Sequence, residues 1–156
     1  DLPTAAMQSL ADNDEIELVA GLQGGFEEIA LNGGKAEGQP HPALLDLEFR
    51  RAMNYAIDKQ GAVDDLWAGL AEPATTISVG ADLKWVPEIP ENEQFNYAPG
   101  RAIEILDAAG YLDTNGDGLR EVPGGGDNIV LRHAVNTDLD RGQAEIQQVR
   151  HPCPRP

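Results

Sequence analysis

Apolar residues recur every three or four positions in two separate stretches of the chain, and this spacing predicts two amphipathic helices. In the first stretch, within residues 41–59, Asp46 precedes the apolar positions and is a predicted N-cap. The apolar face of this helix is formed by Phe49, Ala52, Met53, Ala56 and Ile57. The second stretch spans residues 98–109, and Gly110 follows it as a stop signal. Its predicted buried positions are Ala102, Ile103 and Leu106.

A shorter helix is predicted directly after the first stretch. Asp58 either ends the first helix or caps this next one, which runs to about residue 68 and ends at Gly69. Its inward residues are predicted to be Val63, Leu66 and Trp67. Two further helices are predicted over residues 4–11 and 138–149.

Alternating apolar and polar residues predict three strands, over residues 15–20, 26–31 and 128–135. Residues 72–100 contain several prolines and few helix signals, so an irregular surface segment is expected there. Strands that alternate with helices favour an α/β fold. At 156 residues the chain can form a domain of ordinary size with a real core.

Four phrases in fixed order resemble the large extracellular solute-binding proteins of ABC importers, a family that captures peptides, nickel and some sugars. The phrases are FRRAMNYAID at residues 49–58, GLAEPA at 69–74, AIEILDAAGY at 102–111 and DTNGDGLRE at 113–121. The resemblance implies a periplasmic-binding-protein-like fold, in which two lobes close on a solute. It further implies that residues 1–150 are an incomplete C-terminal lobe. Residues 151–156 do not resemble the family and are expected to be a non-native or disordered tail.

The resemblance also implies a function. It is that of the substrate-binding component of an ABC importer, which captures oligopeptides or a related small solute and delivers them to a membrane permease. Such a component is not an enzyme and requires no cofactor, and the parent protein is expected to be a periplasmic or extracellular, cell-surface lipoprotein. An isolated incomplete lobe is expected to bind solute weakly or not at all. Two alternatives from other classes are a calcium-stabilised extracellular interaction module and a hydrolase.

The amino-acid composition argues against several classes of function. The formal net charge of -16 argues against nucleic-acid binding, which needs clustered Lys and Arg. The same acidity either steers cations toward the molecule or serves solubility alone. The longest apolar runs are too short to span a bilayer. Cys153 is the single cysteine, which excludes a disulfide framework. No spacing typical of a nucleophile with its base, or of paired catalytic carboxylates, is visible, which argues against the hydrolase.

Oxygen-bearing residues at alternate positions, followed by Gly118, match the start of a calcium-binding loop. The candidate ligands are Asp113, Asn115, Asp117, the Leu119 carbonyl and Glu121. A complete loop of this kind carries Glu at its twelfth position, where this chain has Gly124. Two interpretations therefore stay open: a structural calcium ion, or a tight turn held by side-chain hydrogen bonds to backbone amides.

Three residues are candidates for contacting a solute. Arg50 and Asn54 lie in the first resembling phrase, where we expect an architectural role and keep a ligand contact as the alternative. Trp85 lies in the irregular segment, where an aromatic side chain is free to stack on a ligand in an open cleft. The histidines are not at ligand spacing from one another and are expected to be structural or solvated.

Overall fold

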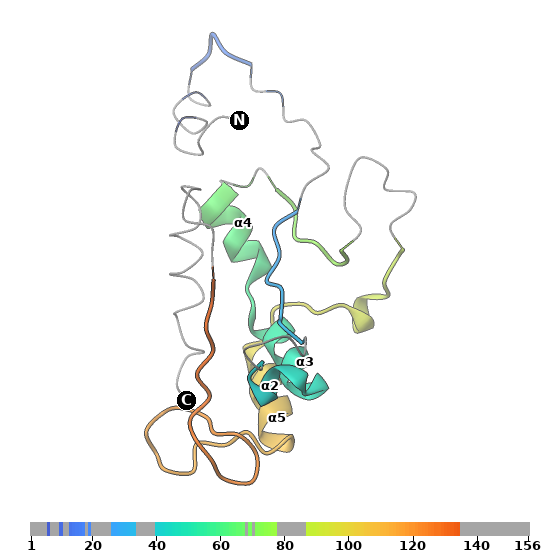
Figure 1. The fold of residues 1–156 in the computed structure, drawn as a ribbon. Coiled ribbons are helices and arrows are strands. Elements are labelled where there is room, and N and C mark those ends of the chain that lie inside the picture. Colours follow the sequence, from blue (N-terminus) through green and yellow to red (C-terminus); the bar gives the residue numbers. More distant parts are fainter. Residues whose placement is uncertain are drawn as a thin grey trace. The chain divides into compact units, whose positions relative to one another are not determined.

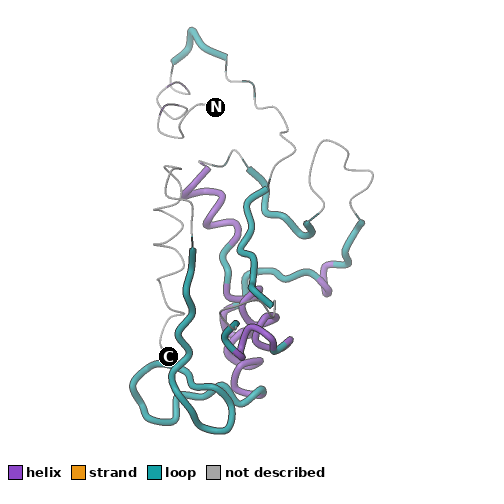
Figure 2. The backbone as a smooth tube through the Cα atoms, in the orientation of Figure 1, coloured by secondary structure: helices purple, strands orange, loops and turns teal. Residues whose placement is uncertain are grey.

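The structure is a computed structural model that describes residues 6, 10, 13–17, 19, 26–33, 40–67, 69, 71–77 and 87–134. Figure 1 and Figure 2 show the path of the backbone, and the chain divides into two compact units. The first unit comprises residues 1–27, 58–94 and 134–156, and the second comprises residues 28–57 and 95–133. Each unit is described by itself below.

The second unit contains three helices: α2 (Pro42–Leu45), α3 (Leu47–Ala56) and α5 (Pro99–Ala108). Helix α3 packs against both α5 and α2, as Figure 1 shows. The buried core consists of Ala43, Phe49 and Tyr111, and the two aromatic rings lie 5.1 Å apart. Partly buried side chains packed around this core are Leu44, Met53, Leu106, Ala109 and Ile129.

Asp46 caps α3 as the sequence predicts. One carboxylate oxygen, Oδ1, accepts the backbone amide of Glu48 at 2.9 Å. The other, Oδ2, accepts the Tyr111 hydroxyl at 2.8 Å. One side chain therefore both starts the helix and joins it to the segment that follows α5. The burial of Phe49 and Ala52 is confirmed.

Ala56 was predicted on the buried face of α3, but it is exposed. It is the last residue of the helix, where fewer neighbours can cover a side chain. The start of α5 lies beside this end, because the backbone amide of Ala98 donates to the carbonyl of Tyr55 at 2.9 Å. Ring packing between Tyr55 and Phe95, with centroids 5.1 Å apart, supports the same junction.

Helix α5 starts with Pro99 in its first turn, a position that needs no amide donor. It ends before Gly110, whose φ of 84° is a left-handed conformation that favours glycine. Ala102 is its most buried residue, at 2% exposure, whereas Ile103 and Leu106 are half-buried. Ala52 of α3 is buried to a similar degree, so both packed helices bury a small side chain, which permits their backbones to approach closely.

The first unit contains α4 (Lys59–Trp67) and a short 3-10 helix, η2 (Glu91–Glu93). Asp58 caps α4, because its Oδ1 accepts the Gly61 amide at 2.8 Å. Val63 and Leu66 are buried as predicted. Beyond the helix, Gly69 has a φ of 75° and its amide returns to the Val63 carbonyl, which confirms the predicted stop. The described parts of residues 72–98 otherwise form irregular, mostly exposed chain, as expected.

The three predicted strands are wrong in their described parts, residues 15–17, 19, 26–31 and 128–134. Within the described ranges the only pairing of this kind is a single antiparallel bridge between Glu121 and Asn128. Alternating residues favour an extended backbone, but a strand forms only when a second segment pairs with its amides and carbonyls. The described residues are therefore helical with long connections, not α/β.

Several predictions fall on residues outside the described ranges. The helix over residues 138–149 and the tail at 151–156 lie wholly outside them. Within the helix predicted over residues 4–11, the structure describes Ala6 and Leu10, and both are helical.

Candidate functional site

Arg50 and Asn54 lie on α3 and both bond to backbone carbonyls. The Arg50 guanidinium donates from Nη1 to the carbonyl of Leu44, in α2, at 2.9 Å. The Asn54 side chain donates from Nδ2 to the carbonyl of Arg50, one turn earlier, at 3.0 Å. Both side chains are half-buried. These bonds fit the architectural role that the sequence favoured, because Arg50 fastens α2 to α3. The third candidate, Trp85, lies outside the described residues.

The residues proposed to bind calcium lie together in the loop of residues 113–121, which follows α5. Asp113, the first residue of the loop, accepts three of its backbone amides. Oδ1 accepts the amides of Gly116 at 2.7 Å and Asp117 at 3.2 Å, and Oδ2 accepts the amide of Gly118 at 2.8 Å. Asn115 Oδ1 accepts the Asp117 amide at 2.8 Å. Carboxylate and carboxamide oxygens thus bond to the amides of their own loop, as in the turn interpretation.

Asp117 joins this loop to the turn that follows it. Its Oδ1 accepts the Leu119 amide at 2.8 Å, and its Oδ2 accepts the side-chain amide of Asn128 at 2.7 Å. The bond from Asn128 is the main reason that the pKa of Asp117 is lowered. The charged form of this carboxylate is therefore the one that fits the folded loop.

Glu121 is buried, with 3% exposure, and its carboxylate accepts hydrogen bonds from Thr114. Its Oε2 accepts the Thr114 amide at 3.1 Å and the Thr114 hydroxyl at 2.5 Å. The neighbouring Arg120 donates from Nη1 to Asp107 Oδ1 at 2.6 Å and to the Tyr111 carbonyl. These contacts fix the base of the loop to the end of α5.

The geometry bears on the calcium prediction without deciding it. Across the described ranges, no group of three or more His, Cys, Asp and Glu side chains is arranged to hold a metal ion. Both carboxylate oxygens of Glu121, the proposed ninth-position ligand, accept hydrogen bonds from Thr114. Calcium binding would require several of these oxygens to exchange backbone amides for the ion, and it stays a prediction.

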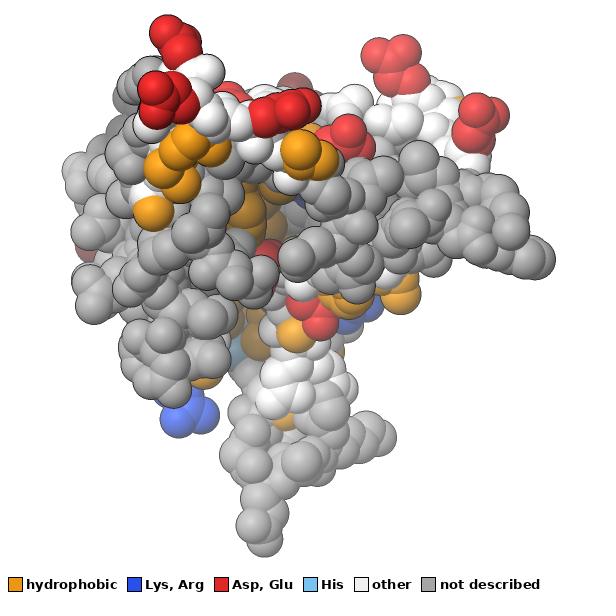
Figure 3. All heavy atoms as spheres, turned by 90° about the horizontal axis from the view of Figure 1, so that it is seen from above, with side chains coloured by type: hydrophobic (Ala, Val, Ile, Leu, Met, Phe, Trp, Pro, Cys, Tyr) orange, Lys and Arg blue, Asp and Glu red, His pale blue; other side chains and the backbone are white. Residues whose placement is uncertain are grey.

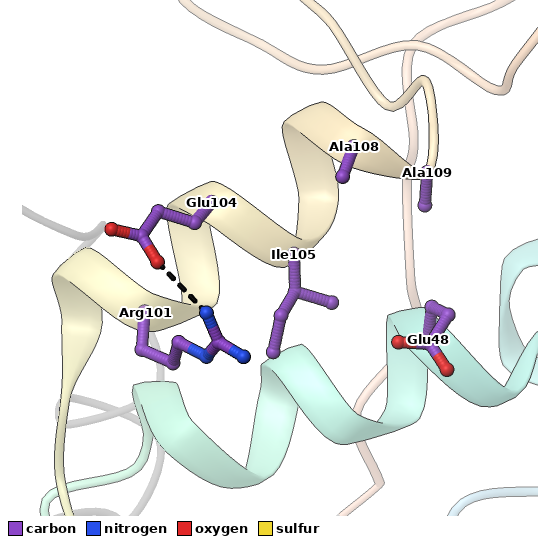
Figure 4. Close-up of a pocket in the computed structure, with 6 residues that line it drawn as sticks. All are labelled: Glu48, Arg101, Glu104, Ile105, Ala108 and Ala109. Atoms are coloured by element: carbon purple, nitrogen blue, oxygen red, sulfur yellow. Dashed lines mark hydrogen bonds and ion pairs between the residues drawn. The ribbon is translucent and has the colours of Figure 1, made fainter.

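The sequence analysis did not anticipate a shallow hollow of about 300 Å³ between α3 and α5. Its lining residues, shown in Figure 4, are Glu48, Arg101, Glu104, Ile105, Ala108 and Ala109. The adjacent alanines of α5 are the sequence signal, because small side chains next to Ile105 leave space open. Arg101 pairs with Glu104 at 3.0 Å and Glu48 with Arg51 at 3.2 Å, so the charges at its rim are balanced within each helix.

Acidic side chains are prominent on the surface, and several project from the face drawn in Figure 3. This agrees with the formal net charge of -16. In the part of the chain that the structure describes, no helix has the length and apolar character needed to cross a membrane. Every buried side-chain nitrogen and oxygen of that part has a hydrogen-bond partner.

Comparison with known proteins identifies the family. Residues 1–150 match the family of bacterial extracellular solute-binding proteins, family 5, middle region. The nickel-binding periplasmic protein of Escherichia coli K12 is 28% identical over 124 residues, which cover 77% of this chain and 21% of that protein. A putative ABC transporter peptide-binding protein of Brucella ovis is 33% identical over 78 residues, which cover 50% of this chain and 14% of that protein. A similar protein of Brucella abortus matches to the same extent.

The chain therefore belongs to the family 5 bacterial extracellular solute-binding proteins. This confirms the resemblance drawn from the four phrases. The family implies a two-lobed periplasmic-binding fold. The chain spans about a fifth of the length of the nickel-binding relative and less of the Brucella relatives. No solved structure matches the chain significantly.

Proposed function

We propose that this chain is part of the C-terminal lobe of an ABC importer's solute-binding protein, and that the whole protein captures oligopeptides. The observation that carries the proposal is the match of residues 1–150 to the family, since four ordered phrases and the family model agree on it. The peptide-binding names of the Brucella relatives support a peptide cargo. A nickel complex is the second candidate, supported by the name of the Escherichia coli relative.

The mechanism is capture without chemical change. Two lobes close on the solute, bury it, and present a surface that a membrane permease recognises. In this scheme the α3–α5 pair is a rigid element of one lobe, because it is held by a buried core and by the Asp46–Tyr111 hydrogen bond. We place the whole protein in the periplasm or at the cell surface, anchored as a lipoprotein, with an ABC permease as its partner.

We propose different roles for the three candidate residues: one contacts the solute, and two stabilise the fold. Trp85 is the proposed solute contact, because the sequence predicts an irregular segment there and an aromatic ring in such a segment can stack on a peptide. Arg50 and Asn54 position α3, since their side chains donate hydrogen bonds to backbone carbonyls. A direct solute contact by either would require it to exchange that bond for the ligand.

The test uses the complete protein that carries this segment, titrated calorimetrically with short peptide pools and separately with Ni²⁺. We expect peptide binding, and recovery of the peptide with unchanged mass. Trp85→Ala should weaken binding about tenfold, which corresponds to roughly 1.4 kcal/mol. Tyr97→Ala removes a different aromatic ring, which is 50% exposed, and is the matched control, with affinity unchanged.

Three results would count against parts of this proposal. Binding of Ni²⁺ with no peptide binding would contradict the peptide cargo, but it would still agree with a solute-binding protein. Cleaved peptide would contradict transport without chemical change. Absence of binding to any peptide pool and to nickel would contradict a peptide-or-nickel binding protein altogether.

A further inference from the structure

Asn115 and Gly116 form a dipeptide that can react with itself, and the surrounding loop places polar groups around the reacting atoms. We propose that this loop promotes the deamidation of Asn115 through a succinimide, so that the folded chain modifies itself at this position. The inference is independent of the proposed transport function. It rests on two hydrogen bonds of the loop, one at the nucleophilic nitrogen and one at the carbonyl oxygen, and on the open space at Gly116.

The nucleophile would be the backbone nitrogen of Gly116. Its N–H donates to Asp113 Oδ1 at 2.7 Å, so a carboxylate polarises the N–H bond and increases the electron density on nitrogen. Gly116 is exposed and has a φ of 78°, and apart from its two chain neighbours no residue places an atom within 4 Å of the position that a Cβ would occupy. The space beside the Gly116 Cα is therefore open to water.

The electrophile would be the side-chain carbonyl carbon of Asn115. Its Oδ1 accepts the backbone amide of Asp117 at 2.8 Å. A backbone donor at this oxygen stabilises the negative charge that develops on it when a nucleophile adds to the carbon, which is the role of an oxyanion hole in enzymes. The side-chain nitrogen, which is the leaving group, donates to Asp117 Oδ2 at 3.1 Å.

The reaction balances with water as the only other reactant. The Gly116 nitrogen forms a bond to Asn115 Cγ, and the amide proton passes through water to the departing side-chain nitrogen. The Cγ–Nδ2 bond breaks and ammonia leaves a five-membered succinimide. Water then adds to one of the two ring carbonyls and opens the ring, which gives aspartate or isoaspartate at position 115. No oxidant, reductant or metal takes part.

The product would change the loop that makes it. Deamidation removes one of the two side-chain donors to Asp117 Oδ2 and adds a third carboxylate beside Asp113 and Asp117. Like charges close together repel, and isoaspartate also lengthens the backbone by one carbon. The loop should therefore loosen locally after reaction, while the core around Phe49 stays intact.

The experiment follows position 115 by peptide mapping and mass spectrometry, with the full 156-residue chain incubated near neutral pH either folded or in urea. We expect ammonia loss at position 115 on the order of tenfold faster in the folded chain. This is less than the roughly 100-fold that one preorganised donor supplies inside an enzyme, because the loop is open to water. A folded rate equal to or below the rate in urea would overturn the proposal.

Two variants distinguish activation of the Gly116 nitrogen by Asp113 from simple solvent exposure of Asn115. Asp113→Asn keeps an oxygen at the Gly116 amide but removes the charge, and it should slow the folded reaction several-fold. Asp127→Asn removes an exposed carboxylate from the next turn and is the matched control, with the rate unchanged. Circular dichroism and hydrogen exchange at the Gly118 amide verify that the loop persists. Faster reaction in Asp113→Asn would show that the loop protects Asn115, and would contradict the inference.

Discussion

The α3–α5 pair and the loop of residues 113–121 lie in the same unit, yet different forces hold them. The helices bury Phe49, Ala52 and Ala102 and pack their apolar faces together. The loop is exposed almost throughout, and carboxylate or carboxamide oxygens bonded to backbone amides define its shape. Stability should therefore concentrate in the helices, whereas the loop should respond to charge, pH and chemical modification.

Tyr111 connects the two regions. It is 2% exposed, packs on Phe49, and donates its hydroxyl to the capping carboxylate of Asp46. Its carbonyl accepts Arg120 from the other end of the loop. Changes at this residue should affect the helices and the loop together, whereas changes elsewhere should affect one region alone.

The largest effect is expected in the apolar core. Phe49→Ala should lower the free energy of unfolding by about 3–5 kcal/mol, because it leaves a cavity beside Tyr111. Urea denaturation measures this loss. Leu45→Ala is the control, because Leu45 is 54% exposed and its truncation should cost less than about 1 kcal/mol. Equal losses in the two variants would show that Phe49 is not part of a stabilising core.

The next effect concerns the polar junction between Asp46 and Tyr111. Asp46→Ala removes a helix cap and leaves a buried hydroxyl without its acceptor, and should cost about 2–3 kcal/mol. Tyr111→Phe removes only the hydroxyl bond and should cost about 1 kcal/mol. The loss of unfolding free energy in the double variant should be smaller than the sum of the losses in the two single variants. Full additivity would contradict a direct interaction between these side chains.

Alkaline pH tests the same junction without mutation. Burial, then the hydrogen bond to Asp46 and its negative charge, raise the pKa of Tyr111 from 10.0 to about 12. A raised pKa in the folded state means that the stabilisation is complete below pH 10 and is lost as pH rises through about 12. In an ultraviolet titration, Tyr111 should ionise only as the pH approaches about 12. Its ionisation at the ordinary pKa would contradict the hydrogen bond to Asp46.

A smaller effect, confined to the loop, is expected at acid pH. The pKa of Asp117 is lowered chiefly by the bond from Asn128, so its stabilisation is present above the unfolded-state pKa. It is lost as pH falls through the lowered folded-state value. Amide exchange measured by nuclear magnetic resonance, expressed relative to the intrinsic rate at each pH, should accelerate at Leu119 in acid and in Asp117→Ala, and remain unchanged in α3. Acceleration in α3 as well would show that the loop and the helices open together.

The smallest expected effect is that of calcium. Because the candidate oxygens already accept amides of their own loop, the melting temperature should be the same with Ca²⁺ and with a chelator. Scanning calorimetry provides the measurement, and Mg²⁺ is the control ion. A rise specific to Ca²⁺ that is abolished in Asp113→Ala would establish the calcium interpretation of this loop instead.

The sequence predicted α3, α4 and α5 because their signals are local, whereas it did not predict the short helices α2 and η2. Asp46, Asp58, Gly69 and Gly110 act on amides and carbonyls within one or two turns, so their roles are visible without the fold. The strands could not be predicted in this way, because Ile129 and its neighbours need a partner segment that alternation does not supply. Tyr111 was also missed as a junction, since its partner Asp46 lies 65 positions away.

The most direct test of the proposed solute capture is small-angle X-ray scattering of the complete two-lobed protein that carries this segment, with and without its cargo. The account predicts a smaller radius of gyration on addition of a binding peptide or Ni²⁺, with α3 and α5 equally protected from exchange in both states. Dimensions that stay the same at saturating ligand would contradict a protein that closes around its solute.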